Sequence, residues 1–219
     1  MNNAKLSQLK ELGSQRQSKV YDGYSNLSDF HNGVYETDFV SPYTKTAHNV
    51  DSLIVLVLQD WASSDSLNAV NIDQDTVQLG YTPTWPTNTN LRLLLEETYN
   101  LRFQDVFITN LFPFIKKGNV SASIRQSDFN RAFEEFCWPQ IKIVQPKLVV
   151  CLGSAVYYTF AKNLPSPKGS RNYAVGDSLE TAGITIYYQC HPGARGMKRR
   201  GRDKVFDDWM SMKKKVSFM

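Results

Sequence analysis

The chain has 219 residues, of which 42% are hydrophobic and 21% are charged, a composition that fits one soluble globular domain with a substantial core. No apolar run approaches the ~20 residues that a membrane span needs. The N-terminal run MNNAKLSQLKELG lacks the apolar core of a secretion signal, so we expect a cytoplasmic protein without a membrane partner. We also expect a monomer.

The net charge of +4 is unevenly distributed along the chain. Residues 195–219 hold nine Lys or Arg and three Asp or Glu, whereas residues 1–194 hold 16 basic and 18 acidic side chains. This asymmetry predicts a polyanionic partner, most simply nucleic acid. A solvated basic tail is the alternative interpretation.

The first part of the chain predicts a helix followed by irregular structure. Leucines recur at helical spacing within residues 3–20, and residues 21–48 are rich in Gly, Asn, Ser, Tyr and Pro. We therefore divide the chain into an N-terminal helix with an irregular wrap, residues 1–48, and an α/β domain, residues 49–219, which includes the basic segment.

From residue 49 onward, predicted strands alternate with predicted helices. Strands are expected at residues 53–58, 105–109 and 147–152, helices at 91–97, 127–144 and 153–162, and a weaker strand pair at 174–188. Residues 61–90 predict a long loop, which is uncommon in a compact domain unless it binds something. The alternation predicts a parallel sheet in an α/β layer fold.

Polar side chains end three of the apolar strands. The first strand leads to Gln59 and Asp60, the second to Asn110, and the last to His191. Carboxyl ends of parallel strands meet at one edge of a sheet, where open α/β sheets bind their ligands. We therefore expect these side chains to converge on one site.

Four segments, in chain order, resemble motifs of the uracil-DNA glycosylase superfamily. The first is Leu58-Gln59-Asp60-Trp61, which is similar to the family's GQDPY, and the second is Ile108-Thr109-Asn110, which is similar to the strand end that reads the uracil edge. The third is similar to a stretch of the iron–sulfur branch and consists of Cys137-Trp138-Pro139 with Pro146-Lys147-Leu148-Val149-Val150-Cys151-Leu152-Gly153-Ser154-Ala155. The fourth is His191-Pro192-Gly193-Ala194-Arg195, which is similar to the final His-Pro motif. The resemblance covers about residues 50–205. It implies a uracil-DNA glycosylase-like α/β fold, a three-layer α/β/α sandwich with a central, mainly parallel four-stranded sheet.

The chemistry of base removal suits these residues. Asp60 would position the attacking water and favour the developing oxocarbenium charge, with Gln59 supplying hydrogen bonds in the same pocket. Asn110 would pair with the O4/N3 edge of uracil. His191, as a neutral imidazole, would donate to uracil O2 as negative charge accumulates there. A turn, cap or core role is the alternative for each.

An extruded base also needs an aromatic partner on which to stack. The resemblance places such a residue after the first motif, where Tyr81 and Trp85 are the candidates. Trp61 would line the pocket instead. A place in the hydrophobic core is the alternative for all three.

The basic segment after His191 would form the loop that enters DNA. Arg195 or Met197 would fill the gap left by the extruded nucleotide, and Ser154 would donate to a phosphate at a helix N-terminus. The cations expected to contact phosphates, and so to make the affinity salt dependent, are Lys198, Arg199, Arg200 and Arg202, with Lys116 and Lys117 extending the track.

The sequence also departs from the family's pattern. Of its three cysteines only Cys137 matches an iron–sulfur ligand, so we expect no cluster, no metal and no other cofactor. Trp61-Ala62 replaces Pro-Tyr, and Leu58 replaces Gly. Because that Tyr helps to exclude thymine in the best-known branch, the target base stays open.

These features predict a monofunctional DNA glycosylase, a hydrolase of base excision repair. It would cleave the N-glycosidic bond of uracil or a related deaminated base in damaged DNA, by base flipping and water attack. The alternative is a non-catalytic DNA-binding module with a glycosylase-like fold. A third possibility is an enzyme that acts on free nucleotides, but a small substrate does not explain the nine cationic side chains of the basic segment.

Overall fold

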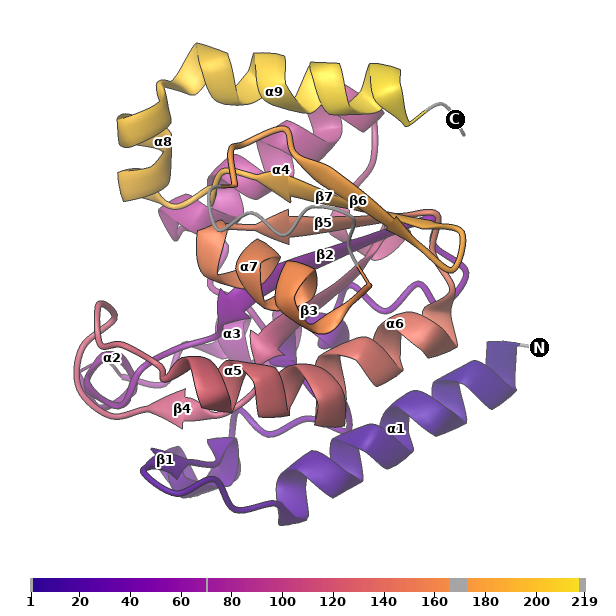
Figure 1. The fold of residues 1–219 in the computed structure, drawn as a ribbon. Coiled ribbons are helices and arrows are strands. Elements are labelled where there is room, and N and C mark those ends of the chain that lie inside the picture. The colour runs from indigo at the N-terminus through magenta and orange to yellow at the C-terminus, as the bar shows by residue number, and fades with distance from the viewer. Residues whose placement is uncertain (1, 70, 166–172, 217–219) are drawn as a thin grey trace.

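A mixed sheet of five strands lies at the centre of the α/β fold (Figure 1). The computed structural model describes residues 2–69, 71–165 and 173–216. The strands, in spatial order, are β3 (Phe107–Phe112), β2 (Ile54–Asp60), β5 (Leu148–Leu152), β7 (Ile184–Gln189) and β6 (Ser178–Thr181). The first four are parallel, and β6 pairs antiparallel with β7 at the edge.

The sheet therefore has one strand more than the four predicted. The extra strand belongs to the hairpin β6–β7, which corresponds to the weaker strand pair expected at residues 174–188. Its turn residues, Ala182 and Gly183, have φ of 48° and 75°. Positive φ at both positions gives the backbone twist that a two-residue hairpin requires.

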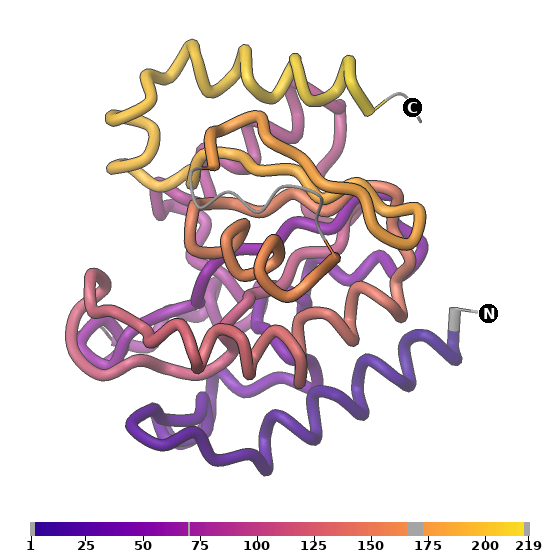
Figure 2. Tube along the Cα trace, in the orientation of Figure 1, coloured from indigo at the N-terminus to yellow at the C-terminus, as the bar shows by residue number. Residues whose placement is uncertain are grey.

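Helices cover both faces of the sheet, which gives the three layers α/β/α (Figures 1 and 2). On one face lie α5 (Gln126–Ala132), α6 (Trp138–Val144) and α7 (Ser154–Asn163), with α1 (Asn2–Ser18) packed outside α6. On the other face lie α4 (Pro86–Tyr99) and α9 (Arg202–Lys215). The hydrophobic side chains under α5, α6 and α7 form the first core, and those under α4 and α9 form the second core. Side chains of β2 alternate between these two cores, so this strand is buried on both sides.

The helix predicted at residues 127–144 contains a change of geometry. A π-helical segment, Phe133–Cys137, connects α5 to α6. Pro139 follows it, and a proline nitrogen has no hydrogen with which to bond the carbonyl four residues earlier. The wider turn accommodates this missing donor within an otherwise continuous helix.

The predicted long loop at residues 61–90 holds two short helices and the start of a third. These are α2 (Ser64–Asn68), α3 (Gln74–Leu79) and the first residues of α4. Ser63 and Asp73 cap α2 and α3 through their side-chain oxygens, and Gly80 ends α3 in the left-handed conformation. The expectation of a long irregular loop was wrong because these polar residues cap helices as well as forming turns.

The basic segment is helical, which corrects the expectation of a loop after His191. Residues 194–200 form α8 (Ala194–Arg200), and α9 follows after Gly201. Trp209 of α9 is fully buried in the second core. No helix in the described ranges is long and apolar enough to cross a membrane.

The N-terminal wrap follows α1 and packs along β3, the strand at one edge of the sheet. It contains β1 (Tyr24–Ser25), which pairs with β4 (Ile115–Lys116). It also contains three 3-10 turns, Leu27–Asp29, His31–Gly33 and Pro42–Lys45. Outside the wrap, another such turn, Phe103–Asp105, precedes β3. The fully buried guanidinium of Arg16 pairs with Glu36 and donates to the carbonyl of Thr37, at 3.2 Å. This contact holds the wrap against α1.

Candidate functional site

The predicted polar residues lie at the carboxyl edge of the parallel strands. Asp60 is the last residue of β2, Asn110 lies in the neighbouring β3, and His191 follows β7 by two residues. Between β2 and β7, strand β5 ends at Leu152, and α7 begins at Ser154. The charges of Asp60 and Lys116 both influence the pKa of His191, which places all three in one electrostatic environment.

Asp60 is held by two side chains. The Gln59 amide donates to Oδ1 at 2.8 Å, and the Lys116 ammonium pairs with Oδ2 at 2.9 Å. The Lys116 and Asp60 side chains are only 4% and 12% exposed. Breaking a buried pair of this kind costs about 3–5 kcal/mol, because one charge is left without its partner. The carboxylate is therefore fixed in position at the edge of the sheet.

The ring of His191 has a defined tautomer. Its Nδ1 accepts from the Gly193 N–H at 3.0 Å, so the proton of the neutral ring lies on Nε2. Burial lowers the pKa of His191, the charge of Asp60 raises it less, and that of Lys116 lowers it further. The site thus favours a neutral imidazole that can donate through Nε2.

The loop that carries His191 depends on close backbone packing. A Cβ on Gly193 would lie 2.9 Å from His191 Nδ1, and one on Gly196 would lie 2.1 Å from the His191 carbonyl oxygen. Asn90 of α4 donates to the Pro192 carbonyl at 2.8 Å, so this helix also holds the loop. Only glycine fits at these two positions without displacing the loop.

Asn110 contains an unsatisfied buried donor. The residue is fully buried, its Oδ1 accepts from the Ser41 hydroxyl at 2.6 Å, and its Nδ2 has no partner among the described residues. Turning the amide over would satisfy Nδ2 but would leave both Oδ1 and the Ser41 hydroxyl proton unpaired. Because each buried orphan costs about 1–3 kcal/mol, the orientation that leaves only Nδ2 unpaired is favoured.

The wrap contributes two residues to the site that the sequence did not suggest. One is Ser41, and the other is Tyr43, which is 5% exposed and stacks on Tyr81 with ring centroids 6.0 Å apart and planes 5° from parallel. Burial raises the pKa of Tyr43, with a smaller contribution from the charge of Asp60. The charge of Asp60 thus reaches the tyrosine, although no local motif marks either wrap residue.

The other predicted aromatics occupy different surroundings. Trp61 donates from its indole nitrogen to the Gly80 carbonyl at 2.9 Å and contacts Tyr35. Tyr81 also packs against Phe103. Trp85 immediately precedes α4 and is 46% exposed. Thus Tyr81 and Trp61 pack beside the site, and Trp85 lies at the surface.

The predicted DNA-contacting residues divide into two groups. Arg195, Lys198, Arg199 and Arg202 are exposed, and in the described part of the chain they form no ion pair, while Ser154 is exposed at the start of α7. By contrast, Arg200 makes two hydrogen bonds to Asp208, at 2.8 and 2.9 Å, and Met197 is only 7% exposed in the second core. Met197 would have to leave that core to enter a duplex.

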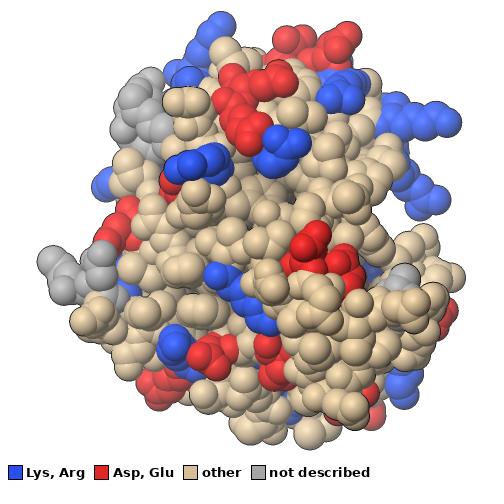
Figure 3. Space-filling view, turned by 180° about the vertical axis from the view of Figure 1, so that it is seen from behind, with Lys and Arg blue, Asp and Glu red and all other residues tan. Residues whose placement is uncertain are grey.

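Basic side chains project from the same side of the molecule as the strand ends. The arrows of β5 and β7 point toward α8 in Figure 1, and Figure 3 shows this side at the right after a half turn. There, Lys and Arg side chains gather above a notch in the surface. These cations and the candidate site therefore lie on one side of the molecule.

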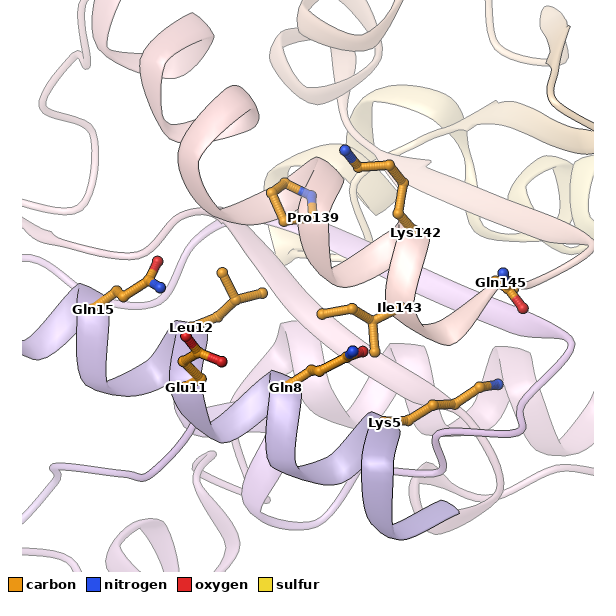
Figure 4. A pocket seen from close by; sticks show the side chains of 9 residues that line it. All are labelled: Lys5, Gln8, Glu11, Leu12, Gln15, Pro139, Lys142, Ile143 and Gln145. Carbon is orange, nitrogen blue, oxygen red and sulfur yellow. The ribbon is translucent and has the colours of Figure 1, made fainter. Parts of the chain in front are cut away.

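A separate groove, with a volume of about 620 Å³, lies between α1 and α6 (Figure 4). It is lined by Lys5, Gln8, Glu11, Leu12, Gln15, Pro139, Lys142, Ile143 and Gln145. The side chains on its rim reach solvent, and none of the predicted site residues lies in it. We place the candidate functional site at the carboxyl edge, because buried and constrained polar groups indicate a binding function more specifically than the volume of a cavity does.

No family model matches the chain, and no curated protein is significantly similar to it. Within the described ranges, no three His, Cys, Asp or Glu side chains group as ligands for a metal ion. Cys137 and Cys151 are buried, and burial raises the pKa of both thiols.

Proposed function

We propose that the chain is a DNA glycosylase of the uracil-DNA glycosylase type. It would remove uracil or a related deaminated base from DNA, as a step of base excision repair. The observation that supports this most is the unpaired Asn110 Nδ2, a buried donor at the sheet edge that also carries Asp60 and His191. A base that accepts a hydrogen bond there would satisfy the orphan.

The orientation of Asn110 favours a base with a carbonyl at the recognised position. Uracil presents O4 to Nδ2, whereas cytosine presents an amino group, which would place donor against donor. A site built to make such a hydrogen bond discriminates strongly against a base that cannot make it. The proposed substrates are therefore deaminated bases, in which a carbonyl has replaced an amino group.

Bond cleavage would proceed through Asp60 and His191. The carboxylate of Asp60 would orient a water toward C1′ and stabilise the positive charge that develops on the sugar. The Nε2–H of His191 would donate to O2 of the departing base, where negative charge accumulates. A neutral ring suffices, which agrees with its lowered pKa and with the proton on Nε2.

The exposed cations of α8 and the start of α9 would hold the DNA backbone. Arg195, Lys198, Arg199 and Arg202 have no ion-pair partner within the described residues. Each phosphate contact would steepen the salt dependence of binding by about one counterion. Arg195 is the better candidate for the gap left by the flipped nucleotide, since Met197 is buried.

A base-release assay tests this function. The purified protein is incubated with single-stranded, U:G and U:A oligonucleotides, and with duplexes that contain hypoxanthine or xanthine, and alkali-labile abasic sites are measured. We expect release from at least one substrate and none with Asp60→Asn. Salt-sensitive DNA binding without release from any substrate would instead support the non-catalytic binding module.

A further inference from the structure

The ammonium group of Lys116 lies within the proposed reaction centre. Its Nζ is 2.9 Å from Asp60 Oδ2 and 2.8 Å from the Val120 carbonyl. Val120 belongs to an exposed turn and is itself 57% exposed, so the buried amine connects Asp60 to a segment at the surface. In the proposed mechanism Asp60 faces C1′ of the sugar, and this brings the same carbon close to Lys116.

We infer that Lys116 captures the abasic product as a covalent imine and so provides a second, lyase activity. The inference rests on the proposed function, because the abasic site is the product of base release. It would make the enzyme bifunctional, rather than the monofunctional glycosylase that the sequence predicts. The ligand is the ring-opened deoxyribose aldehyde, and a buried lysine is the side chain that proteins use to form imines with carbonyl carbons.

The arrangement supplies a path for every proton. The Lys116 ammonium passes a proton to the Asp60 carboxylate, with which it already shares a hydrogen bond, and the neutral amine adds to the C1′ aldehyde. The protonated Asp60 returns that proton to the hydroxyl of the resulting carbinolamine, and water leaves to give the protonated imine. The Asp60 carboxylate then takes a proton from C2′, and the C3′–O bond breaks so that the 3′ phosphate departs as an anion. Addition of water to the imine releases Lys116 as its ammonium and leaves an unsaturated aldehyde on the cut strand.

The experiment uses an oligonucleotide that already contains an abasic site, so it does not depend on which base the enzyme removes. Full-length protein is mixed with this DNA and sodium borohydride, which reduces an imine to a stable amine. We expect a covalent protein–DNA adduct, and mass spectrometry of its peptides should place the link on Lys116. Without borohydride, the strand should be cut on the 3′ side of the abasic site.

Two variants separate a nucleophilic lysine from a merely structural one. Lys116→Arg keeps a cation beside Asp60, but a guanidinium does not form the imine, so the adduct should fall to background. Lys116→Met tests the loss of both charge and amine. Lys147→Met, an exposed lysine at the opposite edge of the sheet, should trap as the wild type does. Thermal melting confirms that each variant is folded.

The outcomes for the two proposals are distinguishable. Base release without an adduct overturns the lyase activity and leaves the glycosylase in place. An adduct on Lys116 without base release from any damaged substrate supports the lyase activity and overturns the glycosylase. A link on Lys117, on the N-terminal amine or spread over the lysines of α8 and α9 also overturns the inference, because those amines react without the Asp60 site.

Discussion

The carboxyl edge of the sheet and the groove between α1 and α6 differ in open volume and in the burial of their polar groups. The groove offers about 620 Å³ of space, and its rim consists of side chains that solvent can reach (Figure 4). The edge instead holds a nearly buried ion pair, a neutral histidine and an amide donor without a partner. Buried polar groups cost free energy, so a fold retains them where they serve a purpose. The free-energy cost of burying polar groups therefore indicates the candidate site better than the volume of a groove does.

The largest expected effect comes from Asp60→Asn, which tests whether the edge is catalytic. The amide keeps the size of the side chain but cannot favour positive charge on the sugar. Base release in single-turnover assays should fall by about 10²–10⁴-fold, the range for a positioned base. DNA affinity should stay nearly unchanged in the same variant. Wild-type turnover by Asp60→Asn would remove this residue from the mechanism.

The pH dependence should report on His191. Burial holds its pKa below the ordinary value of 6.5, so the ring stays neutral at pH 7. Base release should be constant near neutrality and should decline only when the pH drops below that lowered pKa. The folded state should also lose stability as the pH falls below 6.5, because the unfolded chain then takes up the proton first.

Two variants connect this pH dependence to the residue. In His191→Gln the acid loss of stability, followed by denaturant midpoints, should shrink. In Asp60→Asn the ring should titrate at a still lower pH, because the Asp60 charge raises the His191 pKa. Proton NMR of the histidine ring follows this directly. An unshifted or higher His191 pKa in Asp60→Asn would show that the two side chains do not interact.

A smaller effect is expected for Ser41→Ala, which removes the hydrogen bond that orients Asn110. One such bond contributes about 0.5–1.5 kcal/mol, so base release should fall by roughly 2- to 13-fold. Thr44→Val is the matched control, since Thr44 lies in the same wrap and its hydroxyl donates to the Ile108 carbonyl of β3. Both should lower the melting temperature. An equal loss of turnover in the two variants would mean that Ser41 acts only through stability.

The smallest effect is expected in the α1–α6 groove. Gln8→Ala combined with Lys142→Ala changes two exposed side chains on its rim. Surface changes of this kind alter stability by about 0.5 kcal/mol or less, and none contacts the carboxyl edge. Base release and DNA affinity should match those of the wild type. A marked loss of either would transfer the functional assignment to the groove.

The central strands could be predicted from the sequence because both of their faces are buried, which leaves continuous apolar runs. Strand β3 shows the limit of that signal. The polar Asn110 suggested the end of the strand, yet β3 continues to Phe112 because Ser41 satisfies one side of the amide. The helices α8 and α9 were missed for a related reason. Their many cations obscure the few apolar residues, such as Trp209, that dock them on the sheet.

The site could be predicted only where it lies on strand ends. Asp60, Asn110 and His191 each follow an apolar run, and such runs are visible in one sequence. Ser41 and Tyr43 come from an irregular segment with no periodicity, and their contribution depends on how that segment folds back over β3 and α4. Lys116 was visible as a basic residue, but its pairing with Asp60 follows from the path of β4.

The bond between Ser41 and Asn110 also has a consequence for the order in which the protein becomes active. The two residues are 69 positions apart, so at 5–20 residues per second the ribosome adds Asn110 about 3–14 seconds after Ser41. Until β3 emerges, the part of the wrap that carries Ser41 lacks the strand against which it docks. His191 is synthesised later still, so we expect no nascent chain to attack DNA before residue 191 has been added.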